Sequence, residues 1–352
     1  MAQLGQLLDG ERYRPCEWDL RADAAGREYW AGLFRWHLEE VVLPLIRPAG
    51  ADADGGRCAA FRAEYHAALD DISSHPERYG RLDILLFTEV REGLLARHGF
   101  ADPFGEIKRH ENEVALQLLP ELLAELHAAT PADRRALLAA GLLAGNIFDL
   151  GARATINRHR DGNSAFHGTR ATLPPRPWLR DDLDAWWRRW ETAPPYRHVV
   201  FFVDNAGSDI VLGCVPLALW MVAHGARVTL AANSRPVLND ITAAELGPLL
   251  EQCGAVDRPL AEAVRDGRLR VAATGSTAPL VDLTRLSANF VAATRNADLL
   301  ILHGMGRAIE SNFHVRFGCD TLWSAVIKDE AVARRVGGKL FDCVFRFEAA
   351  AG

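Results

Sequence analysis

The sequence of 352 residues has no long apolar run, no excess of basic residues and few cysteines. Its six cysteines are scattered, no two of them form a CxxC pair, and they do not alternate with histidines at the spacing of a zinc site. This pattern argues against a disulfide framework and against a zinc module, so we expect reduced thiols. The cysteines are Cys16, Cys58, Cys214, Cys253, Cys319 and Cys343.

The charge balance excludes another class of protein. Lysine and arginine together number 40, against 46 aspartates and glutamates, which gives a net charge of −6. Because no overall basic field is available for nucleic acid, we expect no nucleic-acid partner. The chain is 49% apolar and 24% charged and has no repeats or low-complexity segments, a composition typical of a folded globular protein.

Signals for membrane insertion and secretion are also missing. The longest apolar run, residues 210–223, is roughly 14 residues long and contains Pro216, whereas a membrane helix needs about 20 residues. The first residues, MAQLGQLLDGER, lack the basic region and apolar core of a secretory signal. We therefore expect a cytoplasmic protein without a membrane partner.

The first part of the chain has a helical pattern. Through residues 1–156 apolar residues recur at helical spacing, which predicts an N-terminal all-helical domain. Its clearest helices cover 26–46, 61–72, 82–97 and 111–128. Residues 157–196 combine a polar, proline-rich stretch with a tryptophan-rich helix over 179–190, so we predict a linker whose tryptophans are packing anchors.

From residue 197 the pattern changes to strands. Continuous apolar, β-prone runs alternate with helix patterns, as expected when parallel strands are buried on both faces. The predicted strands cover 198–203, 227–232, 269–272, 297–302, 323–327 and 340–347. The predicted helices between them cover 210–224, 240–252 and 286–295. This order predicts an α/β fold with a doubly wound, mostly parallel sheet over 197–352.

Polar residues follow the first two of these strands, where ligands gather in open α/β sheets. Asp204 and Asn205 follow the first strand, and Asn233 and Asp240 follow the second. Asp240 either caps the next helix or completes an oxygen-rich site with Asp204 and Asn205, which would suit Mg²⁺ or Mn²⁺. Asp209 is either a helix cap or a functional carboxylate.

The strand at 297–302 is followed by a candidate anion site. It continues as His303, Gly304, Met305, Gly306 and Arg307. Two glycines allow backbone N–H groups to approach a ligand closely, and an arginine can bind phosphate with two parallel hydrogen bonds. The stretch is neither a Walker loop nor the GxGxxG dinucleotide fingerprint.

The helical part of the chain adds further candidates. Asn146 and Asp149 are flanked by glycines, so either the glycines permit tight helix packing or the two polar side chains point into a cleft. Lys108 shares a helical face with Glu111 and Asn112, and this face is either solvated or part of the site.

Several motifs together resemble the damage-control phosphatase family, in the branch of plant stand-alone members and of the carboxyl-terminal domain of animal pantothenate kinase four. The resemblance runs from about residue 60 to the end of the chain. The matching stretches include FADPFGEIKRHEN at 100–112, AGNIFDLGA at 144–152, LPPRPWLRDDL at 173–183, VFFVDNAGSDIVLG at 200–213, LAANSRPVLNDIT at 230–242, VDLTRLS at 281–287 and the segment 297–348.

The resemblance implies an α/β sheet with a helical domain over it and a metal-dependent phosphatase acting on small phosphorylated metabolites. In this branch the expected substrate is 4′-phosphopantetheine or a related phosphoester. The implied metal ligands are Asp204, Asn205 and Asp240, for Mn²⁺, Mg²⁺, Co²⁺ or Ni²⁺. The implied substrate side comprises Asn146, Asp149, Gly304, Met305 and Gly306, and we add Lys108 and Asn233 as candidates.

The chain departs from the family pattern at two places. Members of this branch usually carry Glu before GMGR, where this chain has His303, and Asn-Ser-Gly where this chain has Ala273, Thr274 and Gly275. Imidazole differs from carboxylate in charge and proton affinity. The departures leave open a different substrate, or a family member recruited to another metal-dependent reaction in a secondary-metabolite pathway.

For a phosphatase, the sequence suggests in-line attack on phosphorus by a metal-activated water or by Asp204. Arg307 and the N–H groups of 304–307 would stabilise the phosphoryl oxygens, and Asp209 or His303 would act as acid or base. The alternatives are a carboxyl methyltransferase and a non-catalytic protein that binds a metal or a phosphometabolite. The apolar N-terminal helices could also support a homodimer.

Overall fold

The computed structural model describes residues 1–46, 56–147, 153–154 and 166–350. Within these residues, seven strands form one sheet in the order β1-β7-β6-β5-β2-β3-β4, and only the pairing of β6 with β7 is antiparallel. This confirms the mostly parallel α/β sheet. The strands are β1 (Arg180–Asp181), β2 (His198–Phe202), β3 (Arg227–Ala232), β4 (Leu269–Ala273), β5 (Leu299–His303), β6 (Asp320–Val326) and β7 (Cys343–Glu348).

The direction of winding reverses at strand β2. The chain passes from β2 to β3 and β4 on one side and then returns to β5 on the other side of β2. Phe201 of β2 is paired with Leu230 of β3 and with Ile301 of β5. Such a reversal opens a crevice beyond the carboxyl ends of the strands, where ligands of doubly wound sheets bind.

Two apolar cores lie on the two faces of the sheet. Because successive side chains of a strand point to opposite faces, Val199 and Phe201 belong to one core, and Val200 and Phe202 to the other. Helices on the Phe201 side are α5 (Gly105–Ala128), α6 (Pro131–Gly145), α8 (Phe166–Ala171), α9 (Leu183–Thr192), α10 (Val215–Ala223), α11 (Ala243–Val256) and α12 (Arg258–Arg265). The Phe202 core includes α13 (Ala288–Thr294) and α14 (Glu330–Val336).

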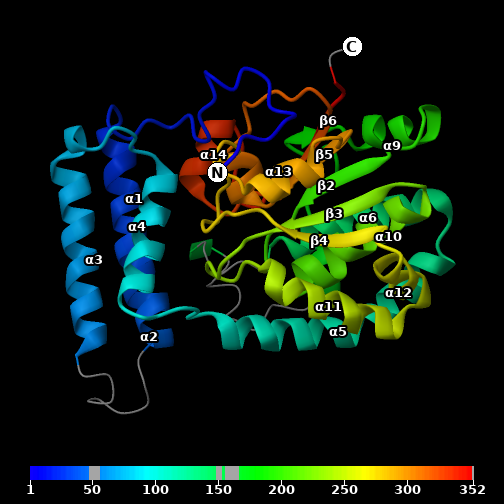
Figure 1. Ribbon diagram of the computed structural model, residues 1–352, viewed down its shortest axis with the longest axis horizontal. Helices are drawn as coiled ribbons and strands as arrows, with labels where there is room; N and C mark the ends of the chain where they lie inside the picture. Colours follow the sequence, from blue (N-terminus) through cyan, green and yellow to red (C-terminus); the bar gives the residue numbers. More distant parts are fainter. Residues whose placement is uncertain (47–55, 148–152, 155–165, 351–352) are drawn as a thin grey trace.

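The Phe202 core continues into a group of N-terminal helices, which stand together at the left of Figure 1. This group contains α1 (Ala24–His37), a π-helical turn at Leu38–Val42, α2 (Leu43–Ile46), α3 (Arg57–Ser74) and α4 (Ile84–Arg97). Asp23 and Asp83 cap α1 and α4 by accepting from the N–H groups of Gly26 and Leu86. Helices α5 and α6 pack on the sheet and not in this group. The domain boundary at residue 156 stays a prediction.

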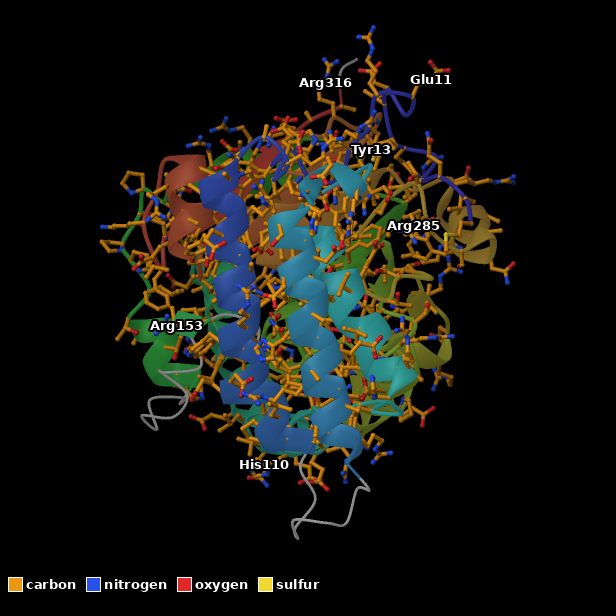
Figure 2. The ribbon with its side chains drawn as sticks, turned by 90° about the vertical axis from the view of Figure 1, so that its left-hand side faces the viewer. Glu11, Tyr13, His110, Arg153, Arg285 and Arg316 are labelled. Atoms are coloured by element: carbon orange, nitrogen blue, oxygen red, sulfur yellow. The ribbon has the colours of Figure 1, made fainter. Side chains whose placement is uncertain are left out.

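The first residues of the chain pack on the α/β part. Ala2 pairs with Leu286, and the Gln6 amide donates to the carbonyl oxygen of Thr294 at 2.8 Å. Figure 1 shows the N-terminus beside α13, and Figure 2 shows Glu11 and Arg316 extending outward from this end. The N-terminal segment therefore links the helical group to the sheet.

The predicted helix over 179–190 begins later in the structure. Arg180 and Asp181 form strand β1 and pair with Val344 and Phe345, and the tryptophan-rich helix begins only at Leu183. The strand forms because the edge of β7 supplies backbone partners, which periodicity along the sequence does not reveal. Trp186 and Trp187 are buried, as expected of packing anchors.

The six cysteines are free, and five of them are buried. None of the described helices combines the length and the apolar character that a membrane-spanning segment requires.

Candidate active site

The loops that follow β2 and β3 are joined by backbone hydrogen bonds. The N–H of Ile241 donates to the carbonyl oxygen of Asp204 at 3.0 Å, and Asn205 forms an isolated bridge with Asp240. The N–H of Ala206 also donates to the carbonyl oxygen of Asn239 at 2.8 Å. Two loops from separate strands are thus held together, and this brings the carboxylates of Asp204 and Asp240 to the same edge of the sheet.

Arg307 connects these two carboxylates. Its Nη1 donates to Asp204 Oδ1, and its Nη2 donates to Asp240 Oδ2 at 2.7 Å. Burial opposes the charge of the guanidinium, but Asp240 and Asp204 together hold the pKa of Arg307 above its ordinary value. The two carboxylates therefore share one buried cation, supplied by the π-helical turn Gly306–Glu310 that follows β5.

Asn146 reaches the same point from the end of α6. Its Nδ2 donates to Asp204 Oδ2 at 3.0 Å and to Asp209 Oδ2 at 3.3 Å, and its Oδ1 accepts from the N–H of Val326. A Cβ on Gly145 would lie 2.8 Å from the Cα of Asp209. The glycine permits close helix packing, which supports the first interpretation, whereas the fully buried Asn146 amide reaches two aspartates rather than an open cleft. Asp149 lies outside the described residues.

Asp209 is not a helix cap. Its Oδ2 accepts from the backbone N–H of Asn205 at 3.0 Å and from Asn205 Nδ2 at 3.2 Å. The Asn205 amide also donates to Asp204 Oδ2 at 3.0 Å. Asp209 thereby fixes the orientation of Asn205, one of the candidate metal ligands.

His303 lies behind Asp209, and both side chains are fully buried. Its Nε2 is 2.7 Å from Asp209 Oδ1, and its Nδ1 is 2.8 Å from Ser324 Oγ. Burial alone would raise the pKa of Asp209, but His303 and the N–H of Asn205 hold it below the ordinary value. Cys214 is also nearby, yet both ring nitrogens of His303 are already engaged.

Gly304 makes room for Asp204. Its φ of +94° is in the left-handed region, and a Cβ there would overlap the Asp204 carboxylate. Its N–H donates to the carbonyl oxygen of Ser324 at 2.9 Å. The predicted use of this N–H as an anion donor is therefore wrong, because a carbonyl oxygen of β6 already accepts from it.

We call this group the strand-end cluster: Asn146, Asp204, Asn205, Asp209, Asp240, His303 and Arg307. A pocket of about 700 Å³, its mouth included, opens onto Asp204, Asp240, Met305 and Gly306. A second set of pocket residues comes from α1 and α4, and we call it the helical wall: Trp30, Leu33, Phe34, His37, Ile84, Thr88 and Arg91. The remaining cluster residues do not line the pocket, so a ligand meets the two carboxylates first.

The comparisons with known proteins agree with this geometry. The model of the damage-control phosphatase ARMT1-like domain matches residues 46–344. The chain belongs to this family. A solved structure of a DUF89 family protein from Pyrococcus horikoshii has the same fold, with a TM-score of 0.62, 16% identity, and coverage of 95% of this chain and 99% of that one.

Curated relatives support the assignment to the damage-control phosphatase family. A 4′-phosphopantetheine phosphatase of Mus musculus is 32% identical over 99% of this chain and 48% of its own length. Pantothenate kinase 2 of Arabidopsis thaliana is 35% identical over 97% of this chain and 41% of its own length. A damage-control phosphatase of Arabidopsis thaliana is 39% identical over 83% of this chain and 79% of its own length. The chain thus spans less than half of the first two relatives.

Lys108 of this damage-control phosphatase domain lies apart from the pocket-lining residues. It is 1% exposed, with its Nζ 3.0 Å from Asp102 and 2.7 Å from Glu245. Glu245 in turn caps α11 together with Thr242. On the same helix, Asn112 Oδ1 accepts from the N–H of Gly207 at 2.7 Å. The predicted helical face is therefore not solvated; it ties α5 to the first turn of α11 and to the loop that follows β2.

Asn233 contacts a carboxylate rather than the pocket. Its Nδ2 donates to Asp240 Oδ2 at 3.0 Å and to the carbonyl oxygen of Ala278 at 3.3 Å. Asn233 is 3% exposed. It orients Asp240 in the same way as Asn146 and Asn205 orient Asp204.

Lys328 was not among the predicted residues. It is buried two residues after the end of β6, and its Nζ donates to the carbonyl oxygen of Asn146 at 2.8 Å. Its positive charge also contributes to the lowered pKa of Asp209. A lysine that closely follows a buried strand was the available signal, under the same rule that identified Asp204 and Arg307.

The donor set fits a divalent cation. Asp204 and Asp240 bring two carboxylates to one point, where the Arg307 guanidinium already supplies positive charge. Asn205 adds an amide group, whose Nδ2 is held by the carboxylates of Asp204 and Asp209. Carboxylate and amide oxygens are the ligands that Mg²⁺ and Mn²⁺ prefer.

Proposed function

We propose that this domain is a metal-dependent phosphatase that hydrolyses a small phosphorylated metabolite. The observation that carries the proposal is the pairing of Asp204 and Asp240 around Arg307, at the point where the pocket meets the reversal of the sheet. Positive charge at such a place attracts and stabilises a phosphoryl group. The names of the relatives from Mus musculus and Arabidopsis thaliana support the same reaction.

Asp204, Asn205 and Asp240 would hold the divalent ion, which is Mn²⁺, Mg²⁺, Co²⁺ or Ni²⁺. When bound, such an ion supplies Lewis-acid charge that neutralises phosphoryl oxygens. Arg307 holds the two carboxylates in register from behind the pocket and adds positive charge to the site without contacting the phosphoryl group itself.

The rest of the cluster acts by orientation. Asn146 and Asn205 both donate to Asp204 Oδ2, which fixes the rotation of this carboxylate. Asp209 holds Asn205, and His303 holds Asp209. Because neither Asp209 nor His303 lines the pocket, we assign both a positioning role in preference to the acid or base role suggested by the sequence.

Two details remain part of this proposal. The proposed substrate is 4′-phosphopantetheine or a related phosphoester, on the strength of the name of the Mus musculus relative. His303 and Ala273 are where a substrate difference from the family would arise. A cytoplasmic location and a homodimer also stay predictions.

The test is phosphate release from an aryl phosphate and from a metabolite panel that includes 4′-phosphopantetheine. Protein stripped with EDTA receives Mg²⁺, Mn²⁺, Co²⁺ or Ni²⁺ in separate assays. We expect metal-dependent release that is lost in Asp204→Ala. The matched control is Asp70→Ala, an exposed carboxylate paired with Arg35, which should retain release. Full activity in Asp204→Ala would refute the proposed function.

A further inference from the structure

The pocket has two walls of different character. On one side it meets the carboxylates of the strand-end cluster, and on the other it meets the helical wall. Leu33, Phe34 and Ile84 form the apolar part of the helical wall, and Leu238 and Leu280 extend this apolar surface. A phosphoester bound at the carboxylates would therefore lay its organic part against α1 and α4.

Two buried hydrogen-bond donors of the helical wall have no partner among the described residues. Arg91 is 3% exposed, and its Nε donates to Glu92 Oε1 at 2.7 Å, whereas its Nη2 is unpartnered. Trp30 is also 3% exposed, and its Nε1 is unpartnered. Buried donors are nearly always satisfied in folded proteins, so an orphaned pair beside a pocket calls for an acceptor from a ligand.

The two donors flank one aromatic ring. The guanidinium carbon of Arg91 lies 5.4 Å from the centroid of the Phe34 ring, and the Trp30 ring centroid lies 6.4 Å from it. Phe87 also packs against Phe34, and the centroids of the two rings lie 5.3 Å apart. Packing of this kind holds the donors in place on two separate helices.

The pocket distinguishes these donors from other orphaned groups. The indole nitrogens of Trp186, Trp187 and Trp190 are also unpartnered, but these side chains pack around α9 and do not line the pocket. An unpaired indole N–H is therefore not by itself a sign of a ligand. Its combination with a pocket, a second orphaned donor and the carboxylates opposite makes the helical wall a built site.

We propose that Arg91 and Trp30 are specificity residues that donate to an oxygen acceptor on the organic part of the substrate. This inference rests on the proposed function. Guanidinium and indole nitrogens are donors only, so the ligand atom must be an acceptor. Since Glu92 already balances the charge of Arg91, the acceptor is a neutral carbonyl oxygen rather than a carboxylate. The substrate class is a phosphomonoester with an apolar chain that carries a carbonyl group.

The test compares alkyl phosphates with keto-alkyl phosphates of equal length, with the carbonyl at the fourth, sixth or eighth carbon. Non-hydrolysable phosphonates of the same series are titrated by calorimetry in the presence of Mn²⁺. We expect the wild type to prefer the ketone roughly 3- to 10-fold at one carbonyl position, in kcat/KM and in affinity, as one or two neutral hydrogen bonds predict. A chain ending in a carboxylate should bind more weakly than the ketone.

The variants Trp30→Phe and Arg91→Lys should remove this preference. Each keeps an apolar or cationic side chain but loses the donor atom in question. Trp187→Phe is the matched control, because it removes an orphaned indole N–H of the α9 region, and it should keep the preference. Melting curves of each variant show whether it is folded. If Arg91→Lys fails to fold, Trp30→Phe and the wild-type series still decide the question.

Three outcomes would separate the claims. Equal binding of ketone and alkyl compounds by the wild type at every carbonyl position would overturn the inference. A preference that survives in Trp30→Phe and in folded Arg91→Lys would overturn the assignment of these donors. Ketone-selective binding without phosphate release from any compound, including the aryl phosphate, would refute the proposed function and leave the carbonyl subsite standing.

Discussion

The strand-end cluster and the helical wall both line one pocket, but they differ in whether their polar atoms have hydrogen-bond partners. In the cluster, Asp204 alone receives hydrogen bonds from Asn146, Asn205 and Arg307. In the helical wall, donors of Trp30 and Arg91 have no partner among the described residues. The hydrogen bonds of the cluster hold its groups in one geometry, as a reaction on a phosphoryl group requires. The unpartnered donors of the helical wall can instead bind an acceptor on the ligand and so select among ligands.

The largest expected effect comes from Gly304→Ala, which would break the cluster. The new Cβ would overlap the Asp204 carboxylate, and the positive φ adds strain. We expect phosphate release to fall by at least about 100-fold, since a displacement of about 1 Å near reacting groups has this effect. Phosphate release and melting temperature are measured for the variant and the wild type.

Gly337→Ala is the control for strain alone. Gly337 also has a positive φ, of +76°, but a Cβ there would meet nothing within 4 Å. It should lose about 1 to 2 kcal/mol of stability and keep its activity. Equal losses of activity in both variants would show that backbone strain, and not the room for Asp204, explains Gly304.

The second prediction concerns the charge inside the cluster. Arg307→Gln leaves two buried carboxylates without their cation, which should lower the free energy of unfolding by about 3 to 5 kcal/mol in EDTA. Because a divalent ion supplies the missing charge, Mn²⁺ should raise the melting temperature of the variant by more than that of the wild type. A variant that is as stable as the wild type in EDTA, or that Mn²⁺ does not stabilise, would contradict the account of this site.

The third prediction asks whether acid sensitivity also arises far from the cluster, at the opposite end of β2. Burial, with the charges of Arg270 and Arg227, lowers the pKa of His198 to about 4. Between about pH 6.5 and pH 4 the unfolded chain binds a proton here that the folded chain does not, so stability falls as the pH falls through this window. The loss should reach about 2 to 3 kcal/mol.

His198→Gln should flatten this acid slope, measured by urea unfolding at several pH values. Its matched control is the exposed His224→Gln, which should leave the slope as in the wild type. An unchanged slope in His198→Gln would place the acid sensitivity elsewhere, including the cluster.

The smallest effect is expected in the helical wall. Leu33→Ala removes apolar surface from the pocket and should raise KM for a long alkyl phosphate by roughly 5- to 20-fold. The effect on an aryl phosphate should be smaller, because the shorter ligand reaches less of the helical wall. Equal effects on both compounds in steady-state assays would place Leu33 in the cluster's function rather than in recognition of the chain.

The strands and the residues at their ends can be predicted from the sequence, whereas the contacts of the helical wall cannot. Strand β3 was predicted at residues 227–232, its observed bounds, because its apolar run is bounded by loops. The rule that ligands follow strand ends located Asp204, Asp240 and Arg307, since each lies in the loop or turn that follows a buried strand. These residues meet because the carboxyl ends of parallel strands lie at one end of the sheet, and a parallel sheet can be inferred from the alternation of strands and helices along the chain.

Contacts between distant segments were not predictable in this way. Lys108 is paired with Glu245, and nothing in the local pattern of either helix identifies that partner. The amphipathic spacing of α1 predicts a buried face, but not that Trp30 and Phe34 face the carboxylates across a pocket. The two-residue strand β1 forms only because β7 lies beside it.

The most direct test of the account is a Mn²⁺ titration of EDTA-stripped wild type and Asp240→Asn, followed by phosphate release from an aryl phosphate and by melting temperature. We predict release in the wild type that depends on Mn²⁺ and falls by at least about 100-fold in Asp240→Asn, because the variant loses a carboxylate ligand. The rise in melting temperature on Mn²⁺ addition should shrink with it. Release that survives EDTA, or an Asp240→Asn variant with wild-type activity, would contradict the central claim that the strand-end cluster holds the metal ion for phosphoester cleavage.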